Sequence, residues 1–140
     1  MADETVAVEH IFTVTANTSQ QAVLQGAPQG TRVLVTVTGG TFEGPKLKGK
    51  VLAGGGDWLT IRADGSFKLD VRITLQTEDG ADILMTYQGI GIREDGVAKI
   101  RTAPLFETGA ENYTWLNNIQ AVAHGTPGQG DVTYTVYALK

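Results

Sequence analysis

The chain has 140 residues, no cysteine and a formal net charge of −4. A chain of this length typically forms one domain, placed here at residues 1–140, and the lack of cysteine excludes disulfide and thiolate chemistry. The 11 Lys and Arg residues form no basic block, which argues against nucleic acid as a partner, and no apolar stretch approaches the ~20 residues that span a membrane. Because the N-terminus carries acids and no long apolar run, we expect no secretory signal and a cytoplasmic location.

Alternation of apolar and polar residues with a period of two predicts β-strands along the chain. In the clearest case, LDVRITLQ at residues 69–76, the apolar side chains all fall on one face. The segment NTSQQAVLQG at 17–26 is compatible with a short turn of helix or with an edge strand. In chain order the predicted strands cover residues 6–16, 32–38, 41–53, 57–62, 66–78, 81–91, 97–107, 115–124 and 131–139.

Short turn signals separate these strands. ADGS at 63–66, EDGA at 78–81 and EDGV at 94–97 contain the Asp-Gly pair that is typical of tight hairpins. A series of strands joined by hairpins either exposes two edges or closes on itself, and closure removes the edges. We therefore predict an all-β fold, a single antiparallel β-barrel of roughly nine strands that is lipocalin-like in outline.

The segment GGTFEGPKLKGKVLAGGGDW at 39–58 contains seven glycines. A phosphate-binding loop places its glycines between a strand and a helix, whereas this segment leads into a strand-like run and lacks the Walker lysine. Glycines also permit bends and close backbone approach at the rim of a barrel. We therefore interpret the segment as a barrel rim, with an extended strand that contains a bulge at Gly44-Pro45.

Three segments in order carry a family resemblance: GGTFEGPKLKGKVLAGGGDW, RADGSFKLDVRITLQTEDGADI and RTAPLFETGAENYTWLN. Together they resemble the hydroalkoxylation-fold family of small β-barrels, formerly a family of unknown function, over the chain from Glu9 to Tyr137. The resemblance implies a barrel with an internal pocket that often self-associates, hence a homo-oligomer, either a dimer or larger. It also implies that some members are cofactor-free cyclases that add a hydroxyl across an activated alkene. The connection before the third segment is shorter than in many members, so the resemblance implies nothing about a lid.

Metal binding is not expected. The two histidines, His10 and His124, lie on distant predicted strands, and no cysteine is present to complete a zinc site. No spaced run of Asp and Asn ends in the glutamate that a calcium loop requires. We therefore expect no metal, and the resemblance implies that no cofactor is needed.

Two carboxylates are the first candidates for chemistry. Asp57 precedes Trp58, and Glu107 comes shortly before Tyr113 and Trp115. A carboxyl group beside aromatic side chains in a partly dry pocket has a raised pKa and exchanges protons near neutral pH. Two such groups in different surroundings could act as acid and base in one turnover. In the alternative interpretation, Asp57 caps a turn and Glu107 pairs with a surface lysine.

Further side chains are candidates for contacts with a substrate. Tyr87, the third catalytic candidate, could donate a hydrogen bond to a developing oxyanion or could fill the core. Asp70 and Arg72 share one strand face, and the sequence leaves open whether this face looks into the barrel or out to solvent. The remaining candidates would hold polar groups or form apolar walls: Glu43, Trp58, Arg101, Trp115 and Asn117.

Three functions are compatible with these residues. The first is acid–base catalysis of the cyclase, lyase or isomerase type, in which Asp57 or Glu107 deprotonates the hydroxyl of a small, largely apolar substrate. Tyr87, Arg101 or Asn117 would hold the substrate carbonyl. The second is a small-molecule-binding barrel without chemistry, and the third is an assembly protein without a ligand cavity. The first function requires a hollow interior toward which the carboxylates turn.

Overall fold

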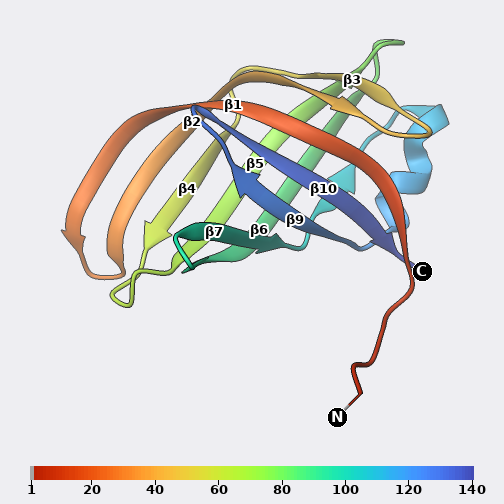
Figure 1. Ribbon diagram of the computed structural model, residues 1–140. Coiled ribbons are helices and arrows are strands. Elements are labelled where there is room, and N and C mark those ends of the chain that lie inside the picture. Colours follow the sequence, from red (N-terminus) through yellow and green to blue (C-terminus); the bar gives the residue numbers. More distant parts are fainter. Residues whose placement is uncertain (1) are drawn as a thin grey trace.

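The computed structural model describes residues 2–140 and shows an all-β antiparallel architecture with one short helix (Figure 1). Residues 2–7 extend away from the body of the molecule as a tail (Figure 1). The elements are β1 (Val8–Ala27), β2 (Gly30–Glu43), β3 (Lys48–Val51), β4 (Gly56–Ile61), β5 (Phe67–Thr77), β6 (Asp82–Glu94), β7 (Val97–Thr102), β8 (Leu105–Glu107), the 3-10 helix η1 (Glu111–Asn118), β9 (Ala121–Pro127) and β10 (Asp131–Leu139).

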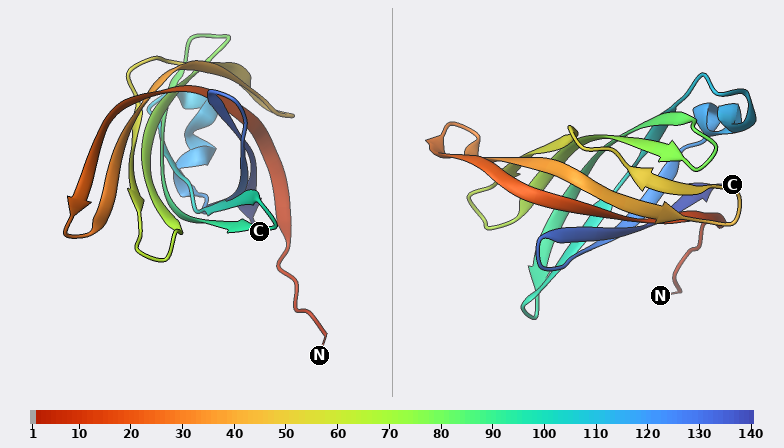
Figure 2. Two further views of the ribbon diagram at one scale, coloured as in Figure 1. Left: turned by 60° about the vertical axis from the view of Figure 1, so that its left-hand side comes forward. Right: turned by 90° about the horizontal axis from the view of Figure 1, so that it is seen from above.

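The strands close into a barrel, as predicted. Their hydrogen-bonded order is β3-β5-β4-β2-β1-β10-β9-β7-β6-β8, and an additional pairing of β5 with β6 completes the ring. β3 and β4 share one place in the ring because both lie between β2 and β5. β8 similarly continues the line of β7 along β6. The left view of Figure 2 looks into the ring, with η1 at its far end.

The β1–β2 hairpin is longer than the sequence pattern predicts. β1 pairs with β10 only as far as Asn17, and from Ser19 onward it pairs with β2 alone. The segment at 17–26 is therefore an edge strand rather than a helical turn. The hairpin projects beyond β10 at the end of the barrel opposite η1 (Figures 1 and 2).

Three predicted strands differ from the structure where the backbone turns. Within 41–53 the chain reverses between β2 and β3, and the Gly44 N–H donates to the Leu47 carbonyl at 2.9 Å, so the predicted bulge is a turn. The range 97–107 divides around Pro104, whose ring nitrogen cannot donate to a ladder. The first part of 115–124 belongs to η1, and β9 begins only at Ala121.

The three predicted Asp-Gly hairpins are present and join β4 to β5, β5 to β6 and β6 to β7. In the third hairpin, Asp95 and Gly96 both have positive φ angles, 54° and 78°. These are the angles of a type I′ turn, whose twist matches that of the strands on either side. The β6–β7 hairpin consequently runs without a bulge from Gly89–Thr102 to Glu94–Val97.

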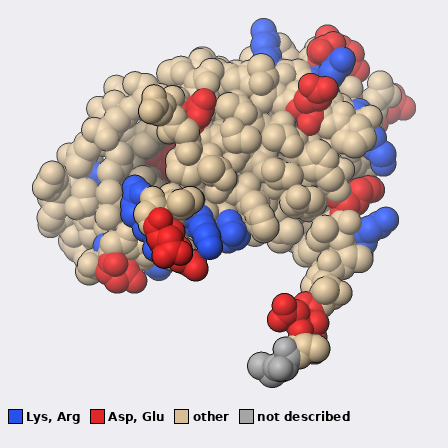
Figure 3. All heavy atoms as spheres, in the orientation of Figure 1, with Lys and Arg blue, Asp and Glu red and all other residues tan. Residues whose placement is uncertain are grey.

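The barrel interior is tightly packed at the end that carries η1. Phe12 lies edge-on to Phe42 and Phe106, with ring centroids 5.6 and 5.8 Å away. Leu116 of η1 is fully buried against this cluster. At the opposite end the molecule is hollowed beneath the β1–β2 hairpin, with Asp/Glu atoms visible in the hollow and charged side chains at its lower edge (Figure 3). The barrel is thus packed at the η1 end and hollow at the end beneath the β1–β2 hairpin.

Candidate functional site

A cavity of about 360 Å³ occupies the hollow end of the barrel. This volume is at the lower end of the range found for small-molecule sites. Its walls are mainly apolar, and the polar groups among them are few. The apolar wall residues include Leu59, Ile61, Phe67, Leu69, Ile100 and Val132. The barrel is therefore neither solidly filled nor polar inside, and it has room for a small apolar molecule.

Asp57 is the carboxylate that β4 turns into this cavity. The regular pairing of β4 with β5 stops after Asp57–Val71 and resumes at Thr60–Lys68. Beside this gap, Oδ1 of Asp57 accepts a 3.0 Å hydrogen bond from the Asp70 backbone N–H. The interruption of the ladder thus supplies a backbone donor that orients the Asp57 carboxylate.

Burial raises the pKa of Asp57 from its usual 3.8 to about 6. Loss of hydration is the largest cause, because the apolar walls disfavour the charged form. The hydrogen bond from the Asp70 backbone lowers the pKa, and the negative charge of the Asp70 side chain raises it. Asp57 is therefore mostly ionised at pH 7, yet close enough to its pKa to accept and return a proton.

Two tyrosines lie near this carboxylate. Tyr134 of β10 lines the cavity, and Tyr87 of β6 packs edge-on against it, with ring centroids 5.1 Å apart. Burial raises the pKa of both phenols above the usual 10.0, and the charge of Asp57 adds to the increase in each. Both hydroxyls are therefore protonated at neutral pH and serve as hydrogen-bond donors.

A glycine on the neighbouring strand β9 leaves room for the ring of Tyr134. A Cβ at Gly125 of β9 would overlap the Tyr134 ring. A Cβ at Gly91 of β6 would likewise overlap the ring of Phe67, which forms part of the cavity wall. These inward-facing glycines allow two large rings to lie against the barrel wall, and the space in front of the rings stays open.

The mouth of the cavity carries opposite charges. Arg93 at the end of β6 and Asp131 at the start of β10 both line it. Among residues 2–140 Arg93 takes part in no ion pair. Its guanidinium is thus available to an anionic or carbonyl oxygen that enters the cavity.

Of the residues selected from the sequence, Asp57 lines the cavity, and Tyr87 lies near enough for the Asp57 charge to raise its pKa. Trp58 follows Asp57 on β4 and therefore faces outward, where it is 47% exposed. Asp70 and Arg72 alternate with the buried Leu69, Val71 and Ile73, so that they also lie on the outer face. Neither tryptophan nor the Asp70–Arg72 pair forms a wall of the cavity.

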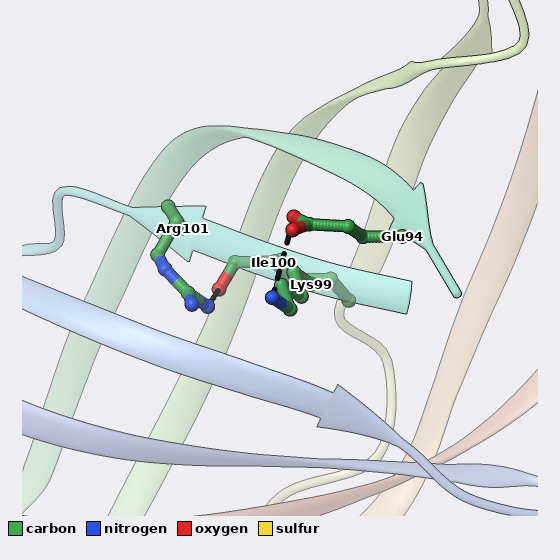
Figure 4. A network of polar contacts seen from close by, with 4 residues as sticks. All are labelled: Glu94, Lys99, Ile100 and Arg101. Atoms are coloured by element: carbon green, nitrogen blue, oxygen red, sulfur yellow. Dashed lines mark hydrogen bonds and ion pairs between the residues drawn. The ribbon is translucent and has the colours of Figure 1, made fainter. Parts of the chain in front are cut away.

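Glu107, Arg101 and Glu43 lie elsewhere on the surface. Glu107 alternates with the buried Phe106 on β8 and points to solvent, away from Asp57. Arg101 of β7 is exposed, and its guanidinium donates to the Ile100 carbonyl at 3.0 Å (Figure 4). Glu43 ends β2 on the surface near η1. The predicted pairing of two carboxylates as acid and base therefore lacks its second member in the cavity.

Trp115 and Asn117 belong to η1 at the packed end. The Nζ of Lys46 lies 5.3 Å from the Trp115 ring centroid, a cation–π contact. The Asn117 amide accepts from the Thr108 N–H at 2.8 Å and donates to the Thr108 carbonyl at 2.9 Å. Asn117 thus ties η1 to the end of β8, and neither residue touches the cavity.

Sequence reasoning missed Tyr134 and Arg93. Tyr134 lies within the predicted strand 131–139, whereas Arg93 lies two residues beyond the predicted end of 81–91, because β6 continues to Glu94. Both side chains fall on the faces that carry the buried residues. The alternation in DVTYTVYAL places Tyr134 with the apolar side chains, which was the available signal. Within residues 2–140, no three His, Asp or Glu side chains gather as metal ligands would. In the same part of the chain, no helix has both the length and the apolar character to cross a membrane.

The sequence matches a family model described as "Protein of unknown function (DUF3237)" over residues 6–139. This chain belongs to the DUF3237 family. The match spans every strand of the barrel, so the residues that line the cavity and the neighbouring Tyr87 all lie within the matched segment.

Relatives of this DUF3237 protein include one with a named activity. The hydroalkoxylation enzyme phnH of Penicillium herquei is 35% identical over 121 residues, which are 86% of this chain and 73% of that protein. A solved enzyme from Penicillium herquei has a TM-score of 0.71 at 30% identity, covering 100% of this chain and 99% of its own. A beta-barrel like protein from Acinetobacter baumannii has a TM-score of 0.88 at 26% identity, with 99% of each chain covered. The barrel and the family resemblance noted in the sequence are both confirmed.

Proposed function

We propose that this DUF3237 protein is a cofactor-independent acid–base enzyme that cyclises a small, largely apolar hydroxylated substrate by intramolecular hydroalkoxylation. The observation that carries the proposal is the carboxylate of Asp57, whose pKa is raised to about 6 in a mainly apolar cavity and beside two protonated tyrosines. The named activity of the relative phnH supports the same reaction class.

In the reaction, Asp57 acts as base and then as acid. Its carboxylate takes the proton from the substrate hydroxyl as the oxygen attacks the β-carbon of an alkene conjugated to a carbonyl. A carbon–oxygen bond forms, the alkene π bond breaks, and its electron pair moves to the carbonyl oxygen to give an enolate. The enolate re-forms the carbonyl as its α-carbon takes the proton back from the Asp57 carboxylic acid. No atom is gained or lost, and the carboxylate is regenerated.

The phenol of Tyr134 stabilises the enolate oxygen. Tyr134 lines the cavity and donates its hydroxyl proton in a hydrogen bond to the developing negative charge. Tyr87 is a positioning residue, since it packs against the Tyr134 ring without lining the cavity. Arg93 at the mouth binds a polar end of the substrate. The apolar walls fold the substrate so that its hydroxyl meets the alkene, and orientation of this kind supplies up to roughly 7–11 kcal/mol.

An ortho-hydroxyaryl enone such as 2′-hydroxychalcone tests the proposal, because its cyclisation to a flavanone has these bond changes. We expect the protein to speed loss of the enone absorbance and to give one flavanone enantiomer in excess on chiral chromatography. Asp57→Asn should abolish both effects, whereas Glu107→Gln, a carboxylate lost from the outer surface, should retain them. Because the cavity measures about 360 Å³, smaller ortho-hydroxyaryl enones should be tested in the same way.

Two results would count against catalysis. If the Asp57→Asn variant were as fast and as enantioselective as the wild type, Asp57 would not be the base. If the flavanone bound in the cavity but neither the wild type nor the variants accelerated cyclisation of the enone, the barrel would be a binding protein without chemistry. Circular dichroism of each variant shows whether the fold is intact.

A further inference from the structure

A second recess lies on the outside of the barrel, across β4 from the cavity. Its volume is about 340 Å³, and it is lined from β2, β4, β5 and β6. We call it the outer groove. Its lining includes Arg32, Trp58, Thr60, Arg62, Lys68 and Asp70. Because successive residues of a strand face opposite sides of the sheet, the outer groove and the catalytic cavity share β2, β4, β5 and β6 but no lining residue.

Three cations line the outer groove around one hydroxyl. Thr60 pairs with Arg32 on β2 and with Lys68 on β5, so these three side chains form one row across the sheet. With strands roughly 4.8 Å apart, the two cations flank Thr60 at a separation of about 10 Å between their backbones. Arg62 lies two residues further along the line of Thr60 and lines the same recess. Side chains of this length at these positions are long enough to reach one common anion.

The positive charge of the groove has little compensation. Among residues 2–140, none of Arg32, Arg62 and Lys68 takes part in an ion pair. Within residues 2–140, Asp70 is the one carboxylate that lines the groove. Asp64 in the neighbouring turn is bonded to Ser66, and its negative charge offsets part of the charge of Arg62. The groove is thus a locally basic site on a chain whose net charge is −4.

Two of the cations are held in place by neutral groups. Arg32 donates from Nη1 to the Trp58 carbonyl at 3.2 Å, and Arg62 donates from Nε to the Ser66 hydroxyl at 2.9 Å. Each guanidinium keeps further N–H donors that make no hydrogen bond within residues 2–140. Oriented guanidinium groups with spare donors match the oxygens of a phosphate.

The groove also offers a flat aromatic surface. Trp58 lines the groove next to the cations and is 47% exposed, so that a large apolar surface of its side chain is not covered by protein. Gln88 and Asp70 lie at this end, where they can bond to polar edges of a ring. A ligand that joins an anionic group to a planar ring would satisfy both parts of the groove.

We propose that the outer groove binds a small planar phosphate ester. The phosphate contacts Arg32, Arg62 and Lys68 and accepts from the Thr60 hydroxyl, and the planar ring stacks on Trp58. This site does not depend on the reaction proposed for the cavity.

Phenyl phosphate is a suitable probe, with inorganic phosphate and phenol as its two halves. Trp58 fluorescence reports binding once the second tryptophan is removed in a Trp115→Phe background. We expect saturable quenching by phenyl phosphate, binding at least tenfold weaker for inorganic phosphate, and none for phenol. In Arg32→Gln/Lys68→Gln the affinity for phenyl phosphate should fall at least tenfold. The control Lys48→Gln/Lys99→Gln removes the same charge at two ion-paired surface lysines and should stay within twofold.

Three results would overturn the proposal. The first is a lack of saturable quenching by phenyl phosphate at millimolar concentration in the folded Trp115→Phe protein. The second is an equal loss of affinity in the two double variants, which would indicate general charge attraction. The third is equal affinity for inorganic phosphate and phenyl phosphate, which would show that the ring does not contact Trp58. Phosphorus NMR titration of the wild type gives the affinities independently of fluorescence.

Discussion

The backbone N–H of Asp70 donates a 3.0 Å hydrogen bond to the carboxylate of Asp57, at the point where the pairing of β4 with β5 is interrupted. The side chain of Asp57 faces the cavity, and the side chain of Asp70 faces the outer surface. The bond fixes the orientation of a carboxylate that is otherwise surrounded by apolar walls. The catalytic role proposed for Asp57 depends on this anchoring.

Replacing Asp57 with Asn should remove the base and leave the shape of the site intact. The amide oxygen of Asn still accepts from the Asp70 N–H, so the fold should be kept. General acid–base catalysis contributes roughly 10²–10⁴-fold, and we expect a loss of this size in kcat/KM for the enone probe. Steady-state kinetics measure this loss. For Glu107→Gln we expect kcat/KM to stay within about twofold of the wild type, because Glu107 lies on the outer surface away from the cavity.

The pH dependence of the rate should report the same group. Catalysis needs Asp57 ionised, so kcat/KM should rise with pH and level off above an apparent pKa of about 6. A profile of kcat/KM from pH 4 to pH 8 checks this expectation. A rate that is flat over this range would exclude Asp57 as the base.

Asp57 should also make folding stability depend on pH. Its folded-state pKa of about 6 is above the usual 3.8, so the folded state binds the proton more tightly than the unfolded chain. The wild type should therefore lose stability relative to Asp57→Asn as the pH rises from about 4 to 6. The difference in free energy of unfolding should change by about 1–3 kcal/mol between pH 4 and pH 7. Urea unfolding of both proteins at each pH measures it, and a constant difference would contradict the burial of this carboxylate.

The two tyrosines should differ in their effect on turnover. Tyr134→Phe removes a donor that faces the substrate, and loss of one such donor typically lowers kcat by about 10²–10³-fold. Tyr87→Phe removes a hydroxyl that does not line the cavity and keeps the ring that packs on Tyr134. We expect an effect on kcat of no more than about tenfold for Tyr87→Phe. The kcat values of the two variants decide which phenol contacts the reacting atoms, and the reverse order would exchange their roles.

Asn117→Ala should affect stability rather than chemistry. The change removes two hydrogen bonds that join η1 to the Thr108 backbone. Loss of these bonds should lower the free energy of unfolding by about 1–3 kcal/mol. Denaturant unfolding measures the cost, and KM for the enone probe should be unchanged because Asn117 is remote from the cavity. A raised KM with unchanged stability would instead favour the substrate contact expected from the sequence.

Hairpin signals and period-two alternation were sufficient to predict an antiparallel barrel. Asp95-Gly96 predicted its turn because few residue pairs adopt positive φ at both positions. The extent of β1 was harder to predict, because its polar segment is stabilised as a strand by pairing with β2 rather than by its own pattern. The helix η1 was missed because eight residues of 3-10 helix leave no long amphipathic stripe.

By itself, the sequence determined the strand alternation, the hairpins and the presence of a carboxylate next to an aromatic residue, because these are properties of neighbouring residues. Only the tertiary structure decided which face of each strand looks inward, since a period of two divides a strand into two faces without naming them. For this reason Asp57 and its neighbour Trp58 were both selected from one motif, yet one lies in the cavity and the other in the outer groove. Tyr134 and Asp57 line the same cavity only because the sheet curves into a barrel and turns β10 and β4 toward one interior, an arrangement that depends on the whole sheet.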